Sequence, residues 1–218
     1  MVLKLQEYLD QSKLNQLELL RSSIKELGKA CVAYSGGVDS SLIAAIAKEQ
    51  LGNNAIAITG VSDSLATYLL KEARQQASWI GIHHQECITR ELEDPNYNQN
   101  PVDRCFACKK ELHFHTTKIA NEFLGAQIID GVNFDDLADH RPGIMAARQA
   151  GVRSPLAELK IEKSTIREIS KALGFPWWDK PSQPCLASRF PYGESITSLR
   201  LNQVAKAEKW IIDHGFTN

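Results

Sequence analysis

Residues 34–41 read YSGGVDSS and lie between two apolar runs, KACVAY, which ends at Tyr34, and LIAAIA, which starts at Leu42. The first run is typical of a buried strand and the second of a helix, so the glycines stand at a turn between them. Gly36 and Gly37 permit a tight turn whose backbone N–H groups can face an anion, and the helix N-terminus adds a positive dipole. The stretch therefore predicts a phosphate-binding loop.

Two better-known phosphate motifs are absent from this loop. A Walker-type loop needs a lysine before Ser40 or Ser41, and a dinucleotide-binding loop needs the spacing G-x-G-x-x-G; the sequence has neither. A plain strand-to-helix turn with a helix cap is the alternative that needs no ligand. The combination of two glycines, two serines and Asp39 between clear strand and helix patterns favours the ligand-binding interpretation.

Strand-like and helix-like segments alternate along the chain. Strands are predicted at 30–34, 54–59, 81–88 and 126–130. Helices are predicted at 3–27, 40–51, 64–80, 107–124, 141–150 and from a capping box at Thr165 and Glu168 to Gly174. This alternation indicates an α/β fold, a parallel sheet flanked by helices on both faces. The loops at 35–40, 59–63 and 131–140 should share one rim, because ligands bind beyond the carboxyl ends of such strands.

The composition is that of a globular protein, with 43% hydrophobic residues among 218 and a net charge of −1. The charge balance argues against a nucleic-acid partner. No stretch resembles a signal peptide or a membrane span, so a cytoplasmic protein is expected. The segment 174–197 carries four prolines and little periodicity, which is typical of a functional loop. Two regions are expected, residues 1–175 and residues 176–218.

The run SGGVDSS resembles the pyrophosphate-binding loop of the N-type ATP pyrophosphatases, which form adenylates and release pyrophosphate. This resemblance implies an adenine nucleotide α-hydrolase-like fold that uses ATP and Mg²⁺. It implies that Asp39 lies near the magnesium and that Thr59, Gly60 and Val61 line the adenosine pocket. The residues implied to hold the pyrophosphate are Ser35, Gly36, Gly37, Val38, Asp39 and Ser40.

Four further motifs give a more specific resemblance: DRCFACKKEL at 103–112, DGVNFDDLADHRPG at 130–143, GVRSPLAEL at 151–159 and KPSQPCLASRFPYGESIT at 180–197. In this order they resemble the ATP-dependent sulfur transferase of the lactate racemase nickel-pincer cofactor pathway. That family implies adenylation of a ring carboxylate of pyridinium-3,5-biscarboxylic acid mononucleotide. A sulfur nucleophile then displaces AMP and leaves a thiocarboxylate.

Three of the five cysteines, Cys105, Cys108 and Cys185, lie in these motifs. In one branch of the resembled family, a cysteine at the Cys185 position gives up its own sulfur and becomes dehydroalanine. In another branch, three cysteines hold an iron–sulfur cluster that carries the sulfur. The resemblance implies this second branch, with a 4Fe-4S cluster as cofactor. For the C-x-x-C pair, the alternatives are a zinc site that includes either His113 or His115, or ordinary thiols at a helix start.

Charged residues near these motifs are candidates for binding the magnesium and the anionic substrate. Asp135, Asp136 and Asp139 near Arg141 could position both, and a turn cap is the alternative role for the first two. Residues expected to flank the sulfur site and bind the substrate are Arg104, Lys109, Ser188 and Arg189. A solvated surface position is the alternative for Arg104 and Lys109. Residues expected to be structural are Cys31, Cys87, His83, His84, Trp177 and Trp178.

Three other classes of protein are weighed as alternatives. An RNA-thiolating ATP pyrophosphatase is disfavoured by the near-neutral charge, an amide-forming synthetase leaves the cysteines unexplained, and a nucleotide sensor would need no chemistry. The family resemblance implies a homo-oligomer, in particular a hexamer, with the helix at 200–213 as a candidate contact. Gly215 suits a left-handed helix cap and FTN then begins a further strand, so a fragment that lacks a C-terminal substrate-binding region is expected.

Overall fold

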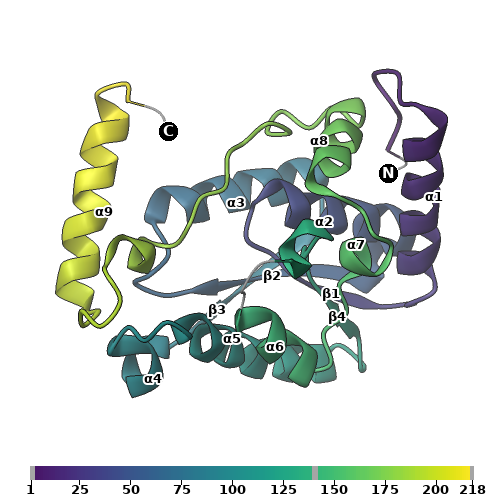
Figure 1. Cartoon of the computed structure of the whole chain (residues 1–218). Coiled ribbons are helices and arrows are strands. Elements are labelled where there is room, and N and C mark those ends of the chain that lie inside the picture. The colour runs from purple at the N-terminus through teal and green to yellow at the C-terminus, as the bar shows by residue number, and fades with distance from the viewer. Residues whose placement is uncertain (1–2, 139–141, 217–218) are drawn as a thin grey trace.

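The computed structural model describes residues 3–138 and 142–216, and Figure 1 shows a central sheet between two layers of helices. Within those residues, four parallel strands form the sheet in the order β3-β2-β1-β4. Their bounds are β1 (Ala30–Ala33), β2 (Ala55–Val61), β3 (His83–Ile88) and β4 (Gln127–Ile129). The predicted α/β fold, a parallel sheet flanked by helices on both faces, is confirmed.

The longer helices form the two layers. One side of the sheet carries α1 (Gln11–Lys25), α2 (Val38–Leu51), α3 (Thr67–Ile80) and α8 (Lys163–Ala172). The other side carries α5 (Arg104–Glu122) and α6 (Pro142–Gln149). The remaining elements are α4 (Pro95–Asn98), α7 (Pro155–Glu158), α9 (Ser198–Asp213), η1 (Gly52–Asn54), η2 (Glu91–Glu93), η3 (Asp135–Leu137) and η4 (Leu186–Arg189).

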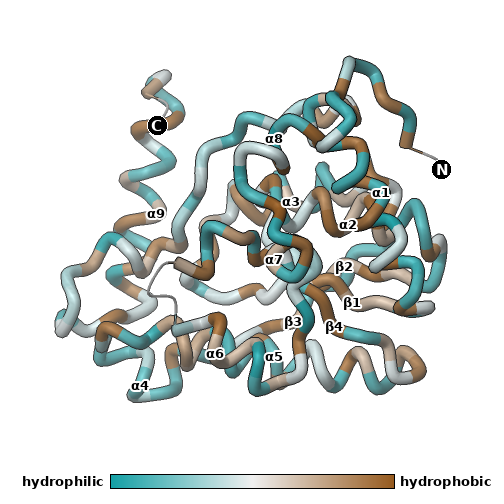
Figure 2. The backbone as a smooth tube through the Cα atoms, turned by 45° about the vertical axis from the view of Figure 1, so that its right-hand side comes forward, coloured by the Kyte–Doolittle hydropathy of each residue, from teal (hydrophilic) through white to brown (hydrophobic). Residues whose placement is uncertain are grey.

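The inner strands form the centre of the core. Ala30, Cys31 and Val32 of β1 have no solvent exposure, because helices cover both faces of an inner parallel strand. Strand β3 lies at the edge of the sheet, and its last residue, Ile88, is 73% exposed. Figure 2 shows hydrophobic residues concentrated along the central strands. The sheet is therefore a rigid platform whose carboxyl end can carry a site.

Two helices are capped in a way that the sequence patterns do not predict. Helix α1 starts at Gln11 instead of near residue 3, because Asp10 caps it. The capping box predicted to start at Thr165 is wrong, since α8 begins at Lys163. The carboxylate of Asp135, from a distant loop, accepts the backbone N–H of Lys163 at 2.8 Å. A partner from elsewhere in the fold thus satisfies the first turn of α8.

The segment 174–197 is irregular apart from η4, as its prolines predict. It packs with α4, α5 and α9 in a separate small core. The buried members of that core are Ala66, Leu69, Tyr97, Ala107, Leu186, Ala187, Phe190, Ile196 and Leu201. Figure 1 shows α9 at the side of the molecule, away from the sheet. None of the helices in the described residues is long and apolar enough to cross a membrane. The boundary expected near residue 175 stays a prediction.

Candidate active site

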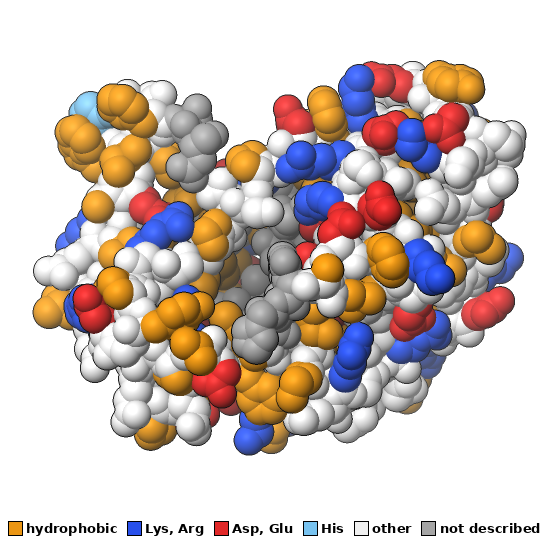
Figure 3. Space-filling model, in the orientation of Figure 1, with side chains coloured by type: hydrophobic (Ala, Val, Ile, Leu, Met, Phe, Trp, Pro, Cys, Tyr) orange, Lys and Arg blue, Asp and Glu red, His pale blue; other side chains and the backbone are white. Residues whose placement is uncertain are grey.

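A cavity of about 640 Å³ lies at the predicted rim, beyond the carboxyl ends of the strands. Its walls come from the glycine loop, the end of β2, the start of α5 and the residue before η4. Figure 3 shows the molecule hollowed in the middle of this face, with hydrophobic side chains along the hollow. The predicted site residues that line the cavity are Ser35, Asp39, Ser40, Thr59, Gly60, Cys105, Cys108, Lys109, Asp136 and Cys185.

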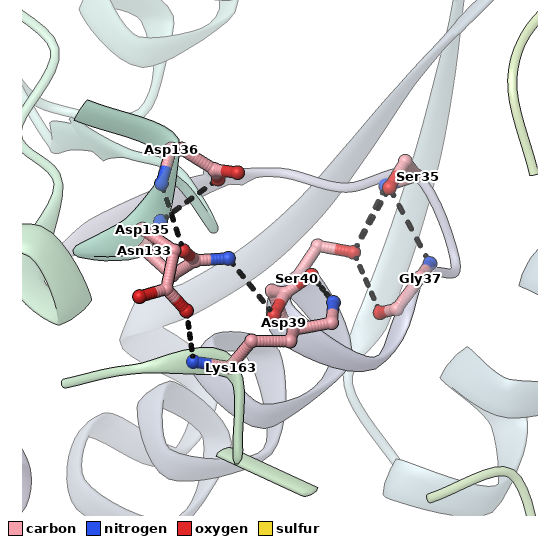
Figure 4. A network of polar contacts seen from close by, with 8 residues as sticks. All are labelled: Ser35, Gly37, Asp39, Ser40, Asn133, Asp135, Asp136 and Lys163. Atoms are coloured by element: carbon pink, nitrogen blue, oxygen red, sulfur yellow. Dashed lines mark hydrogen bonds and ion pairs between the residues drawn. The ribbon is translucent and has the colours of Figure 1, made fainter. Parts of the chain in front are cut away.

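The glycine loop is held in shape by its own hydrogen bonds (Figure 4). The Ser40 hydroxyl donates to the Gly37 carbonyl at 3.1 Å, and its oxygen accepts from the backbone N–H and the hydroxyl of Ser35 at 3.3 and 3.1 Å. Gly36 has a φ of +73°, a conformation that favours glycine. Gly37 is the N-cap residue of α2, which starts at Val38. The loop therefore presents a helix N-terminus to the rim, although Gly36, Gly37 and Val38 are not part of the cavity wall as described.

Gly131, which follows β4, packs directly against this loop. A Cβ atom added at Gly131 would lie 2.6 Å from the Ser40 backbone nitrogen and 2.9 Å from its Cα. Backbone atoms cannot move away as a flexible side chain can, so any larger residue would displace the start of α2. The motif around residues 130–143 contained this glycine, but spacing alone gave no reason to single it out.

Asp39 forms an ion pair with the ammonium group of Lys163, the first residue of α8 (Figure 4). Asn133 also donates to the Asp39 carboxylate, with its amide nitrogen at 3.5 Å. Lys163 is a residue of the site that the sequence patterns did not predict. It lies 124 positions from Asp39, and only the packing of α8 beside α2 brings the two together.

The aspartates after β4 make local hydrogen bonds. Asp135 accepts the first backbone N–H of α8, while Asp136 and Asn133 each donate a backbone N–H to the other's side chain at 3.1 Å. Asp135 thus binds the start of α8 and does not contribute to the described cavity wall, and its role toward magnesium or substrate stays a prediction. Asp136 lines the cavity, and its role toward magnesium or substrate stays a prediction. Asp139 and Arg141 lie outside the described residues.

Thr59 and Gly60, predicted to line the adenosine pocket, are both close-packed. The Thr59 hydroxyl donates to the Tyr34 carbonyl at 2.8 Å, so the ring of His84 must donate from Nε2 to the Thr59 oxygen, also at 2.8 Å. Burial lowers the pKa of His84 and keeps it neutral. A Cβ atom on Gly60 would lie 2.9 Å from Leu112 of α5. Both residues therefore fix the end of β2, and His84 contacts Thr59 there.

Cys105, Cys108 and Cys185 line the same cavity, although Cys185 comes from a distant part of the chain. The first two lie near the start of α5, one helical turn apart, and Cys185 immediately precedes η4. Burial, with a smaller contribution from Glu91, raises the pKa of Cys108 to about 12. Partial removal from water and the nearby Cys105 raise the pKa of Cys185. Both thiols are therefore protonated at neutral pH when no other group is bound.

Across the described residues, no group of three or more His, Cys, Asp and Glu side chains is placed to hold a metal ion. The three thiols share a cavity without forming a ready-made site for one ion. His113, a candidate fourth ligand for zinc, is 2% exposed, and burial lowers its pKa to about 4. His115 contacts Glu111 at 3.1 Å instead. Neither histidine is part of the described cavity wall, which leaves the zinc alternative without support.

Several polar residues around the cysteines were not predicted from the sequence. Glu91 of η2 lines the cavity with 3% exposure, and Ser62 donates to its Oε1 at 2.5 Å. The hydroxyls of Tyr97 and Ser64 are 2.6 Å apart, and the Ser64 carbonyl accepts the backbone N–H of Leu186 at 3.0 Å. The loop after β2 therefore ties η2, α4 and the Cys185 turn together. A short polar loop has no sequence signal for this role.

The basic residues expected beside the sulfur site have different surroundings. Lys109 lines the cavity, and Arg104 is buried with its guanidinium over the ring of Tyr192, 5.0 Å from the centroid. Arg189 instead forms an ion pair with Glu208 of α9 at 2.6 Å. The Ser188 hydroxyl donates to the Cys185 carbonyl at 2.7 Å, and neither Ser188 nor Arg189 contributes to the cavity wall as described. Their predicted contact with substrate stays a prediction.

Comparisons with known proteins agree with this architecture. The family model of asparagine synthase matches residues 18–105. The NH3-dependent NAD synthetase from Campylobacter jejuni superimposes with a TM-score of 0.66 over 94% of this chain and 88% of that chain, at 16% identity. At this identity the likeness shows the fold alone. Together these comparisons fit an adenine nucleotide α-hydrolase-like fold.

Two curated relatives are similar over most of the chain. An uncharacterized protein of Synechocystis sp. is 53% identical over 202 residues, which are 93% of this chain and 75% of that protein. The pyridinium-3,5-bisthiocarboxylic acid mononucleotide synthase of Lactiplantibacillus plantarum is 32% identical over 198 residues, 90% of this chain and 72% of that enzyme. The similarity therefore covers both the glycine loop and the cysteine motifs.

Proposed function

This chain belongs to the family of pyridinium-3,5-bisthiocarboxylic acid mononucleotide synthase, and from that premise we propose that it is an ATP-dependent sulfur transferase of nickel-pincer cofactor biosynthesis. Its fold is that of the N-type ATP pyrophosphatases. The proposed substrate is pyridinium-3,5-biscarboxylic acid mononucleotide, one carboxylate of which is adenylated and then thiolated.

The observation that carries this proposal is a single cavity with two chemically different ends. Ser35, Asp39 and Ser40 line the phosphate end, and three thiols line the sulfur end. A reaction that first activates a carboxylate and then delivers sulfur to the same carbon needs both groups within reach of one bound molecule. A nucleotide sensor would have no use for the thiols.

At the phosphate end, we propose that the helix N-terminus at Gly37 and Val38 holds the pyrophosphate part of ATP. Asp39 is the proposed ligand of the magnesium ion that accompanies ATP, since carboxylate oxygens suit Mg²⁺. A substrate carboxylate oxygen attacks the α phosphorus, and pyrophosphate leaves. Lys163, which pairs with Asp39, is the proposed contact of the phosphates when the magnesium takes its place.

At the sulfur end, we propose that Cys105, Cys108 and Cys185 hold a 4Fe-4S cluster. The support for this is the chemistry of the donors: a C-x-x-C pair at the start of α5 and a third thiol lining the same cavity offer three sulfur ligands. A bound cluster would supply the sulfur that attacks the acyl carbon and displaces AMP. Binding must also remove the thiol protons, which the raised pKa of Cys108 and Cys185 makes costly without a metal.

Anaerobic reactions with Mg-ATP and the pyridinium mononucleotide test the proposal. Wild type is expected to form AMP, pyrophosphate and a thiocarboxylate. The variants Cys105→Ala, Cys108→Ala and Cys185→Ala should each lose the thiocarboxylate and still release pyrophosphate. Cys87→Ala, a half-buried thiol on β3, is the matched control and should retain both products.

Two results would change the assignment. Formation of ADP and orthophosphate would exclude the pyrophosphatase chemistry. Loss of activity in Cys185→Ala alone, with a wild-type Cys185 that becomes lighter by one H₂S, would show that Cys185 gives up its own sulfur. Iron and sulfide counts on anaerobically purified protein distinguish sulfur transfer from a cluster from sulfur transfer by Cys185 itself, and they do not depend on turnover.

A further inference from the structure

Glu91 is a buried carboxylate on the cavity wall that lacks a positive partner. Its side chain is 3% exposed and lines the cavity near the three thiols. Oε1 accepts a hydrogen bond from Ser62, whereas Oε2 has no hydrogen-bond partner among the described residues. No ion pair of Glu91 is found within that part of the chain either. A binding cavity thus contains an acid that is fixed in place and incompletely satisfied.

An unpaired buried carboxylate is costly, because removing a charge from water costs several kcal/mol unless a cation compensates it. The nearby cations do not serve this purpose. Lys109 lines the cavity but forms no ion pair with Glu91, and Arg104 lies over Tyr192. The compensating charge is therefore expected to arrive with a ligand.

We propose that Glu91 is the counter-ion of the positively charged ring of the substrate and makes the site specific for a quaternised pyridinium. This inference rests on the proposed function, which supplies the ring. The ring nitrogen carries a fixed positive charge, and the two ring carboxylates and the phosphate are negative. Lys109 and Arg104 suit the negative groups, and only an anion suits the nitrogen. Ser62 holds the carboxylate in one orientation, so the ring charge also orients the substrate.

Two small probes that differ in the ring charge test this assignment. N-methylpyridinium-3,5-dicarboxylate carries the fixed charge, and pyridine-3,5-dicarboxylate at pH 8 does not. Calorimetry on the wild type should give about tenfold tighter binding of the charged probe. In Glu91→Gln, a variant of nearly the same shape, the ratio should fall to about one. Glu93→Gln, on the same turn and with a side chain that is 71% exposed, should retain the wild-type ratio.

Thermal melts and ATP binding establish that the variants are folded. If Glu91→Gln does not fold, Ser62→Ala takes its place, because it leaves the carboxylate charged but loosely held and should reduce the ratio about threefold. Equal affinity of the wild type for both probes, or an unchanged ratio in the variants, overturns the inference. Failure of the wild type to bind either probe overturns it too.

Pyrophosphate release with the full substrate separates this inference from the proposed function. If wild type releases pyrophosphate but does not prefer the charged probe, only the role of Glu91 is wrong. If it prefers the charged probe but releases no pyrophosphate with ATP, the sulfur-transferase assignment is wrong and the charged-ring site stands.

Discussion

The phosphate end and the sulfur end of the cavity are built in different ways. At the phosphate end, Ser35, Gly37 and Ser40 are close in sequence and satisfy one another's hydrogen bonds. At the sulfur end, Glu91 and Cys185 come from separate segments, and buried polar atoms lack partners among the described residues. The first end is complete before any ligand binds, whereas the second awaits groups that the chain does not supply. The nucleotide therefore meets a loop with satisfied hydrogen bonds, whereas the substrate meets a buried carboxylate with one unsatisfied oxygen.

The replacement Asp39→Ala should have the largest effect, because it removes the proposed magnesium ligand and the partner of Lys163. Substrate-dependent pyrophosphate release should fall at least about a hundredfold, while the protein stays folded. Asp213→Ala, at the end of α9, is the control and should leave the rate unchanged. A rate in Asp39→Ala within about twofold of wild type would show that the phosphate end does not depend on this carboxylate.

Replacing Gly131 or Gly143 by alanine should test whether the phosphate end is more rigid than the sulfur end. In Gly131→Ala the new Cβ would meet the backbone of Ser40, so ATP affinity should drop about tenfold and stability by about 1–3 kcal/mol. In Gly143→Ala the new Cβ would lie 2.9 Å from the side chain of Lys109. That flexible side chain can rotate away. Gly143→Ala should therefore cost less than about 0.5 kcal/mol. Calorimetric titrations measure the ATP affinity of each variant, and thermal melts measure its stability. Equal losses of stability in the two variants would show that the two ends do not differ in rigidity.

The prediction with the smallest consequence at neutral pH concerns acid stability through His113 on α5, the helix that carries two of the thiols. Burial lowers the pKa of His113 from 6.5 to about 4, so the unfolded chain takes up a proton in that window and the folded chain does not. Stability should thus be intact above pH 6.5 and fall by on the order of 3 kcal/mol as the pH drops toward 4.

The variant His113→Gln should flatten this part of the pH profile, and His214→Gln on the exposed end of α9 should not. Denaturant melts between pH 4 and 8 give the comparison, and hydrogen exchange should report weakening of α5 before the glycine loop. If the slope of stability against pH is the same in wild type and His113→Gln, the buried imidazole does not cause it.

The sequence predicted what is local and missed what depends on packing between distant segments. The glycine loop was recognisable because strand, turn and helix signals for residues 30–51 are continuous. The contact of Lys163 with Asp39 spans 124 positions and follows from helix packing. The capping box at Thr165 failed for the same reason, since Asp135 caps α8 from another loop.

For the cysteines, the sequence predicted a shared site but not the residues that surround it. Their motifs predicted a common site, and the fold does bring Cys105 and Cys185 to one cavity. Nothing in the polar segment before Cys105 indicates that Glu91 and Tyr97 would be buried beside the cysteines, because an acid in a polar loop is usually solvated. The electrostatic character of the sulfur end arises only when η2, α4 and the Cys185 turn pack around the loop after β2.

The short loop after β2 also bears on how such a chain can change its length during evolution. Ser62 holds Glu91 and Ser64 holds both Tyr97 and Leu186, so these few residues set the spacing between the sheet and the Cys185 turn. An insertion there would move the sulfur end relative to the nucleotide. The turn Gly52–Asn54 lies at the opposite ends of the strands, where inserted residues would leave that spacing intact. Insertions of varying length are therefore expected at the turn Gly52–Asn54 and not in the loop after β2.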